Sequence, residues 1–156
     1  MKITTQLLKE KKASSSCIDK FIEHFPSGEA EYQDVLDKLA ELNDANNARW
    51  LLNTIGKTDA VLKIDGDIES KNLFFGGSIK VTGFIKVDFF LIAGGGIKAG
   101  LGIEAGDSIK AGLGFGVYAG LKIRLNYWPI DAKVSAKTKP ENLVSGFWVE
   151  SSEVSK

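Results

Sequence analysis

The stretch IKAGLGIEAGDSIKAG, residues 97–112, repeats one six-residue phrase in which a large apolar residue is followed by a charged residue, alanine and glycine. Outward from this stretch, the large apolar position recurs nine times at a spacing of six, at Leu73, Ile79, Ile85, Leu91, Ile97, Ile103, Ile109, Phe115 and Leu121. A second apolar or small position follows two residues behind each of them. A repeat of fixed period predicts a solenoid.

The period of two inside each hexad predicts short strands, and the glycines between them predict corners. Three strands with their corners make one coil of roughly eighteen residues, as in hexapeptide β-helices. This folding predicts three inward columns, namely Leu73–Leu91–Ile109, Ile79–Ile97–Phe115 and Ile85–Ile103–Leu121. We attribute the corner glycines to tight turns that need a positive φ. An antiparallel meander of glycine-rich strands is the alternative fold.

The residues before Gly56 differ from the repeat, because glycine is rare there and the apolar spacing is helical. The pattern predicts four short helices. The first is centred on residues 3–8, the second follows a cap at Ser14–Ser16, and the third covers residues 32–42. The fourth begins after a cap at Asp44 and ends at Gly56. Because the end of a solenoid needs a cap, we expect this small bundle to cover the N-terminal coil.

The two ends of the repeat are irregular. Residues 61–70 carry a related phrase in a shifted phase and are expected to begin the stack with an irregular coil. After the last hexad, the aromatic and proline-containing residues 127–156 are expected to form capping strands, with a frayed tail from Val154. We therefore predict an α+β fold: a helical bundle (1–56), a three-sided β-solenoid of about three to four coils (57–126) and a C-terminal β cap (127–156).

Composition excludes several classes of partner. The 156 residues carry twenty basic and twenty acidic side chains, so nucleic-acid binding, which depends on phosphate neutralisation, is not expected. Cys17 is the only cysteine, which forbids an intrachain disulfide and favours a reducing compartment. The N-terminal residues lack the apolar core of a signal peptide, and the longest apolar run, Phe89–Ala93, is too short to span a membrane. We therefore expect a cytoplasmic protein without a membrane partner.

The sequence offers few residues for catalysis. His24 is the only histidine and lies in the helical segment, so hexapeptide-repeat acyltransferase and carbonic anhydrase chemistry lack their histidines in the repeat. Cys17, at a helix start, is expected to be a small buried residue rather than a nucleophile. Asp65, Asp67 and Glu69 alternate on a strand but are too few for a calcium site. The glycines 94–96 are not followed by the elements of a phosphate-binding loop. We expect no enzyme, cofactor or metal.

The outward positions of the repeat carry an unusual number of aromatic residues. Exposed apolar patches mark interfaces, and interface hot spots favour aromatics. Lysines on neighbouring outward positions would supply rim contacts to an acidic partner surface. The candidate partner-binding residues are Phe74, Phe84, Phe89, Phe90, Ile92, Lys80, Lys98 and Lys110. The alternative is that the helical cap or the C-terminal segment folds back over this face. A further outward column, Lys86–Glu104–Lys122, predicts a ladder of alternating charge.

Residues 1–8 (MKITTQLL), residues 48–52 (ARWLL) and the repeat of 97–112 together resemble a group of small bacterial proteins. These proteins join a short helical head to a Gly-Asp-Ile-Glu-Ala-Gly-type repeat. The repeat alone also resembles the polymer-forming β-helices called bactofilins, which lack such a head. Both resemblances imply an architecture, and neither supplies a functional residue.

Two functions fit these observations. The first is a non-enzymatic binding protein, best represented by the bacterial immunity proteins that neutralise toxin domains of secreted or contact-dependent inhibition systems; this is an analogy of type. We expect such a protein to be a monomer or a small homo-oligomer with a protein partner. The alternative is a bactofilin-like scaffold whose solenoids stack end to end, which requires open strand edges at both ends.

Overall fold

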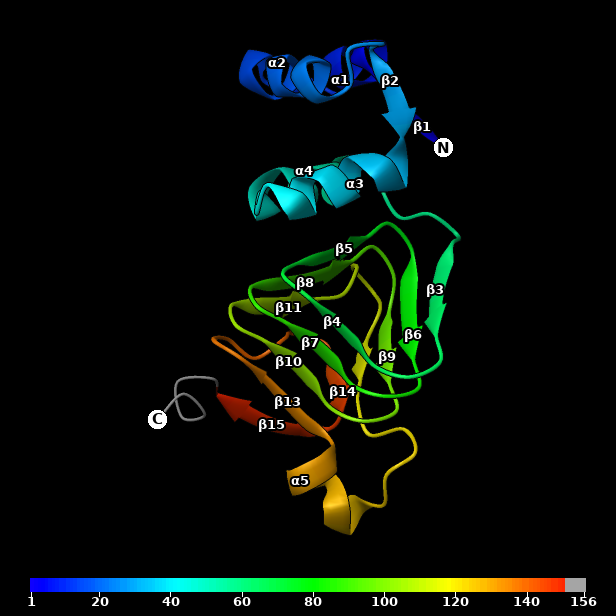
Figure 1. Cartoon of the computed structure of the whole chain (residues 1–156), viewed down its shortest axis with the longest axis vertical. Helices are drawn as coiled ribbons and strands as arrows, with labels where there is room; N and C mark the ends of the chain where they lie inside the picture. Colours follow the sequence, from blue (N-terminus) through cyan, green and yellow to red (C-terminus); the bar gives the residue numbers. More distant parts are fainter. Residues whose placement is uncertain (151–156) are drawn as a thin grey trace.

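The computed structural model describes residues 1–150, and it shows a helical head standing on one side of a parallel β-solenoid (Figure 1). The head contains the four predicted helices, arranged as one layer of α1 and α2 above a second layer of α3 and α4. Their bounds are α1 (Thr5–Glu10), α2 (Ser15–His24), α3 (Tyr32–Glu41) and α4 (Ala45–Thr54). The predicted α+β fold with a helical region before a β-solenoid is confirmed.

Short polar side chains begin three of these helices. Thr4, Ser14 and Asp44 each accept a hydrogen bond from a backbone N–H in the first turn of α1, α2 and α4. Such caps satisfy N–H groups that have no partner inside the helix. The sequence did not predict the two short antiparallel strands β1 (Lys2–Thr4) and β2 (Glu29–Glu31), which join the two helical layers.

Tyr32 ties the start of α3 to the end of the head. Its side chain is buried, its hydroxyl donates to the carbonyl of Gly56 at 2.9 Å, and burial raises the pKa of Tyr32 to about 12. An unfolded tyrosine titrates near pH 10, so the folded state holds this proton more tightly. The stabilisation is therefore complete below about pH 10 and is lost as the pH rises through 12.

Replacing Tyr32 by phenylalanine is expected to cost about 1 kcal/mol at neutral pH, because the Gly56 carbonyl loses its donor. The difference in unfolding free energy between wild type and Tyr32→Phe should shrink from about pH 10 upward, because only the wild type loses stability when this hydroxyl ionises. Urea unfolding at a series of alkaline pH values measures this difference. A difference that stays constant up to pH 12 would contradict the assignment.

The solenoid has three sides, each a parallel sheet with one strand per coil. The first side contains β3 (Val61–Ile64), β6 (Ser78–Val81), β9 (Ile97–Ala99), β12 (Val117–Tyr118) and β14 (Leu143–Ser145). The second side contains β4 (Ile68–Ser70), β7 (Ile85–Val87), β10 (Ile103–Ala105), β13 (Lys133–Ala136) and β15 (Phe147–Glu150). The third side contains only β5 (Leu73–Phe75), β8 (Phe90–Ala93) and β11 (Ser108–Lys110).

The inward columns follow the predicted register for the first coils and then depart from it. Leu73, Leu91 and Ile109 stack as predicted. In the following coil, however, Val117 is in register with Ile97, so the prediction of Phe115 at this position was wrong. Val134 is in register with Ile103, so the prediction of Leu121 was wrong as well. The columns shift because residues 112–116 are longer than a hexad corner, and residues 120–132 leave the solenoid before β13 returns to it.

The stack is longer than the three to four coils that the hexads predicted, because both ends contribute strands. The phase shift at residues 61–70 appears as a spacing of seventeen residues, since Leu62 pairs with Ile79 and Ile68 with Ile85. At the other end β13, β14 and β15 extend the first and second sheets, so the strands expected to form a separate cap continue the coils. The predicted frayed tail from Val154 lies outside the described residues.

The glycines at the corners serve close packing between coils. Gly94, Gly100 and Gly106 all have negative or extended φ values, so the prediction that they need a positive φ was wrong. A Cβ atom at each of them would instead overlap a backbone carbonyl oxygen of the preceding coil, such as that of Thr82 beneath Gly100. Glycine is required because the strand spacing of about 4.8 Å leaves no room for a side chain at this position.

The head packs against the outer face of the third side (Figure 1). The side-chain amide of Gln33 donates to the carbonyl of Phe74 at 2.7 Å and accepts from the N–H of Gly76 at 2.9 Å, which satisfies the outer edge of β5. The predicted cap therefore covers one strand of the first coil. The outer edges of β3 and β4 pair with no other strand of the described chain.

Candidate functional site

The predicted aromatic face is largely covered by the head. Phe74 and Ile92 are each 1% exposed and belong to the apolar core of the head, so their prediction as exposed anchors was wrong. They point outward from the solenoid, but α3 and α4 bury them. This confirms, for these two residues, the alternative in which the helical segment folds over the face.

The remaining aromatic candidates differ in exposure. Phe90 is half-buried beneath the guanidinium of Arg49, whose carbon lies 5.2 Å from the ring centroid. Phe84 is half-buried at a corner, where its N–H donates to Asp67 at 2.8 Å. Only Phe89, at 40% exposed and next to Lys71, presents a large part of its ring to solvent. Partner binding at Phe84, Phe89 and Phe90 stays a prediction.

The three candidate lysines lie on two different sides of the solenoid. Lys80 and Lys98 are in register on the first side, and Lys63 extends their predicted basic row. The Lys98 ammonium lies 5.6 Å from the ring centroid of Tyr118, the next outward residue. Lys110 lies on the third side and lines a groove together with Arg49 of α4 in the head. The eight predicted residues therefore do not form one surface.

The second side carries part of the predicted ladder of alternating charge, namely Lys86 and Glu104. Glu69, Lys86 and Glu104 are in register on β4, β7 and β10. The next outward residue is the buried Ser135, so the prediction of Lys122 at this position was wrong. Each contact of such an exposed ladder contributes at most about 1 kcal/mol. We assign this side a structural role.

A large groove, which we call the basic groove, lies where α4 faces the end of the third side. It encloses about 720 Å³ between α4, β11 and residues 138–142. Its lining includes Arg49, Lys57, Lys110 and Lys139, with Glu141 as the acidic residue among those that line it. The sequence prediction named Lys110 but missed the groove, because α4, β11 and residues 138–142 are far apart along the chain.

A second exposed feature is the segment that leaves the solenoid between β12 and β13, which we call the projection (residues 120–132). It contains the short helices η1 (Leu125–Tyr127) and α5 (Trp128–Asp131), which extend below the coils in Figure 1. Leu125 and Ile130 are each 73% exposed, and the large residues Leu121 and Tyr127 are also exposed. The sequence signal for this feature was a run of apolar residues after the last hexad that could not be assigned to any inward column of the solenoid.

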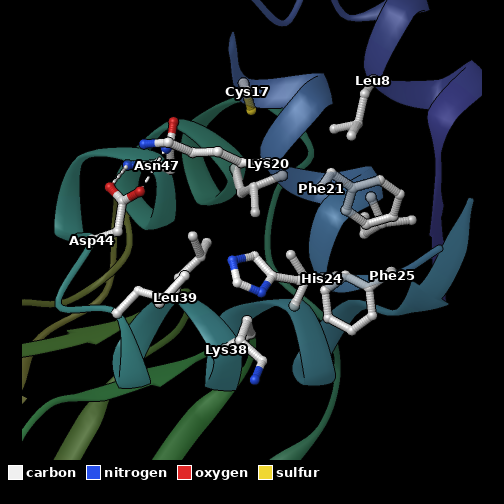
Figure 2. A pocket seen from close by; sticks show the side chains of 14 residues that line it. Leu8, Cys17, Lys20, Phe21, His24, Phe25, Lys38, Leu39, Asp44 and Asn47 are labelled. Carbon is white, nitrogen blue, oxygen red and sulfur yellow. Dashed lines mark hydrogen bonds between the residues drawn. The ribbon is translucent and has the colours of Figure 1, made fainter.

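The head also has a small apolar pocket of about 50 Å³, partly open to solvent, between α2 and the layer of α3 and α4 (Figure 2). Cys17 and His24 both line it, and the His24 ring lies between α2 and α3. Burial raises the pKa of the Cys17 thiol, and the nearby Asp44 carboxylate raises it further against the opposing effect of Lys20. A protonated thiol is a poor nucleophile, so this pocket favours a packing role.

The acidic residues considered for a metal are used within the structure. Asp65 accepts a hydrogen bond from the Thr82 hydroxyl at 3.0 Å, and Asp67 accepts from the N–H of Phe84. Within residues 1–150, no three histidine, cysteine, aspartate or glutamate side chains gather where they could hold a metal ion. The helices described in this range are also too short or too polar to cross a bilayer.

Comparison with known proteins finds a match over the head. Residues 1–58 match the family model of the YdhT N-terminal domain. The match covers α1 to α4 and ends before β3, so it concerns the head and leaves the solenoid outside. No curated protein and no solved structure matches the chain at a significant level. The resemblance of the repeat to bactofilins stays a prediction.

Proposed function

We propose that this chain is a non-enzymatic protein-binding module, and specifically an immunity protein that binds and neutralises a toxin domain. The observation that carries the proposal is the projection. Four large apolar side chains on one short segment are exposed there, at Leu121, Leu125, Tyr127 and Ile130. Clustered exposed apolar residues of this kind mark protein interfaces.

The projection is mounted firmly on the solenoid. At its start, the N–H of Gly120 donates to the carbonyl of Leu101 at 3.0 Å, and at its end Ala132 is fully buried. Inside it, the indole N–H of Trp128 donates to the carbonyl of Ile123 at 2.9 Å. A segment held in one conformation loses little entropy on binding, which favours affinity.

The double variant Leu125→Ser with Ile130→Ser tests the proposal. We expect it to weaken partner binding by at least about tenfold, because each side chain would lose the burial of most of its apolar surface in the complex. Unfolding free energy should change little, since both residues are 73% exposed in the free protein. The measurement is the affinity for the partner that co-purifies in stoichiometric amount, together with growth rescue when both proteins are co-expressed.

A matched control is Val61→Ser, which removes a 49% exposed apolar residue from β3, at the end of the first sheet opposite to β12 and β14. The control should leave affinity and growth rescue unchanged. If the double variant still rescues growth as well as the wild type does, the projection is not the anchor. If the co-purified partner does not slow growth when it is expressed without this chain, neutralisation is not the function of this chain.

A scaffold that stacks end to end is the second candidate, and the outer edges of β3 and β4, which pair with no other strand of residues 1–150, favour it. Val61 in β3 is 49% exposed, which leaves an apolar residue at this end of the solenoid. Exposed strand edges pair readily with other chains. Light scattering over a concentration series separates the two functions: a constant small mass favours the binding module, and mass that grows with concentration favours the scaffold.

A further inference from the structure

We infer that the basic groove binds an acidic segment of the partner protein. This inference rests on the proposed function, because it states the chemistry of the partner at a second contact. The groove is formed jointly by the head and the solenoid, since Arg49 belongs to α4 and Lys110 to β11. A ligand here would contact both parts of the molecule.

The charges of the groove are poorly compensated. Among the described residues, no carboxylate oxygen lies within 4.0 Å of a charged nitrogen of Arg49, Lys110 or Lys139. Lys57 has only Asp59 at 3.5 Å, and Asp59 is fully exposed. Four cations and one carboxylate, that of Glu141, therefore line the groove, and its net positive potential attracts carboxylates and speeds their association.

Arg49 is held ready for a carboxylate. Its Nη2 donates to the Ser108 hydroxyl at 3.1 Å, and its guanidinium carbon lies 5.2 Å from the centroid of the Phe90 ring. These two contacts orient the planar group while the remaining N–H donors stay available. A guanidinium fixed in this way recognises a carboxylate by two parallel hydrogen bonds.

The size and mixed lining of the groove favour a peptide segment over a small anion. A cavity of about 720 Å³ is as large as those that enclose whole small-molecule ligands. Apolar side chains lie among the cations, including Leu52, Phe115 and the 99% exposed Leu113. A segment that combines acidic and apolar residues would satisfy both kinds of contact.

The test uses the full chain and a synthetic octapeptide in which glutamate alternates with leucine, compared with the same peptide carrying glutamine. Calorimetry at low and at physiological ionic strength measures affinity and its salt dependence. We expect the glutamate peptide to bind at least about tenfold more tightly than the glutamine peptide. The Arg49→Gln, Lys110→Gln double variant should lose this preference, and Arg49→Lys should keep part of it.

Matched controls and competitors decide the outcome. Lys86→Gln with Lys133→Gln removes two exposed cations from the second side and should leave peptide affinity unchanged. Equal binding of both peptides, or full displacement of the peptide by inorganic phosphate at equal concentration, would overturn the inference. Peptide preference without any effect on toxin activity would refute the proposed function alone. Toxin neutralisation that survives Arg49→Gln, Lys110→Gln at wild-type affinity would refute the groove alone.

Discussion

Alanine in place of Gly100 is expected to lower the free energy of unfolding by about 3 kcal/mol, although it adds a single methyl group. The added Cβ would overlap the carbonyl oxygen of Thr82 in the preceding coil, and this oxygen belongs to a backbone that cannot rotate away. The coils would have to separate, which would weaken the hydrogen bond from the Gly100 N–H to the Val81 carbonyl. Urea unfolding monitored by circular dichroism measures the loss.

Gly114→Ala is the matched control for Gly100→Ala. Gly114 has a φ of +83° and open space around its Cα, so alanine there meets only the strain of a left-handed backbone. This strain costs about 1–2 kcal/mol. If the two substitutions destabilise equally, close approach between coils is not the reason for glycine at the corners.

The second large effect is expected at Asn72, which joins the solenoid to the head. Its buried amide nitrogen donates to the carbonyl of Ala40 and to the side chain of Asn43, and its oxygen accepts from the N–H of Phe90 at 2.9 Å. Asn72→Ala leaves the carbonyl of Ala40 and the N–H of Phe90, both on half-buried residues, without this partner, whereas water can replace it at the exposed Asn43. Because each unsatisfied buried polar group costs about 1–3 kcal/mol, we expect a loss of about 3 kcal/mol.

Hydrogen exchange shows where this loss occurs. In Asn72→Ala, amides of α3 and α4 should exchange faster than those of the inner strands, because the head separates from the third side before the coils unfold. Gln6→Ala, which removes only an exposed contact to Glu10, should change stability by less than about 0.5 kcal/mol. Uniform acceleration over the whole variant would show that Asn72 stabilises the solenoid and not the docking of the head.

The helices and the coils were predictable because their signals are local. Caps at Ser14 and Asp44 and the hexad period each involve residues within one element or one coil. Docking of the head was not predictable in this way. An apolar outward residue such as Ile92 has the same pattern whether a partner protein or another part of the chain covers it.

The later coils were misread because the period breaks inside residues 112–132. A repeat of six continued in step places Phe115 and Leu121 in the core, whereas the extra residues shift the inward positions to Val117 and Val134. The same shift leaves the apolar residues of the projection outside the core. The exposed residues of the projection were therefore missed for the same reason as the register of the later coils.

The position of the head has a mechanical consequence. If the chain is pulled from its C-terminal side, the coils that β14 and β13 close can peel away one after another, since backbone ladders and the packing of residues such as Val134 and Trp148 hold them without the head. The coil from Val134 to Trp148, for example, then releases about 50 Å of extended chain. The coils that carry β5, β8 and β11 resist unfolding longer, because the head packs across these strands and its contacts must break first. The molecule would extend in steps at its free end and hold firm beneath its head.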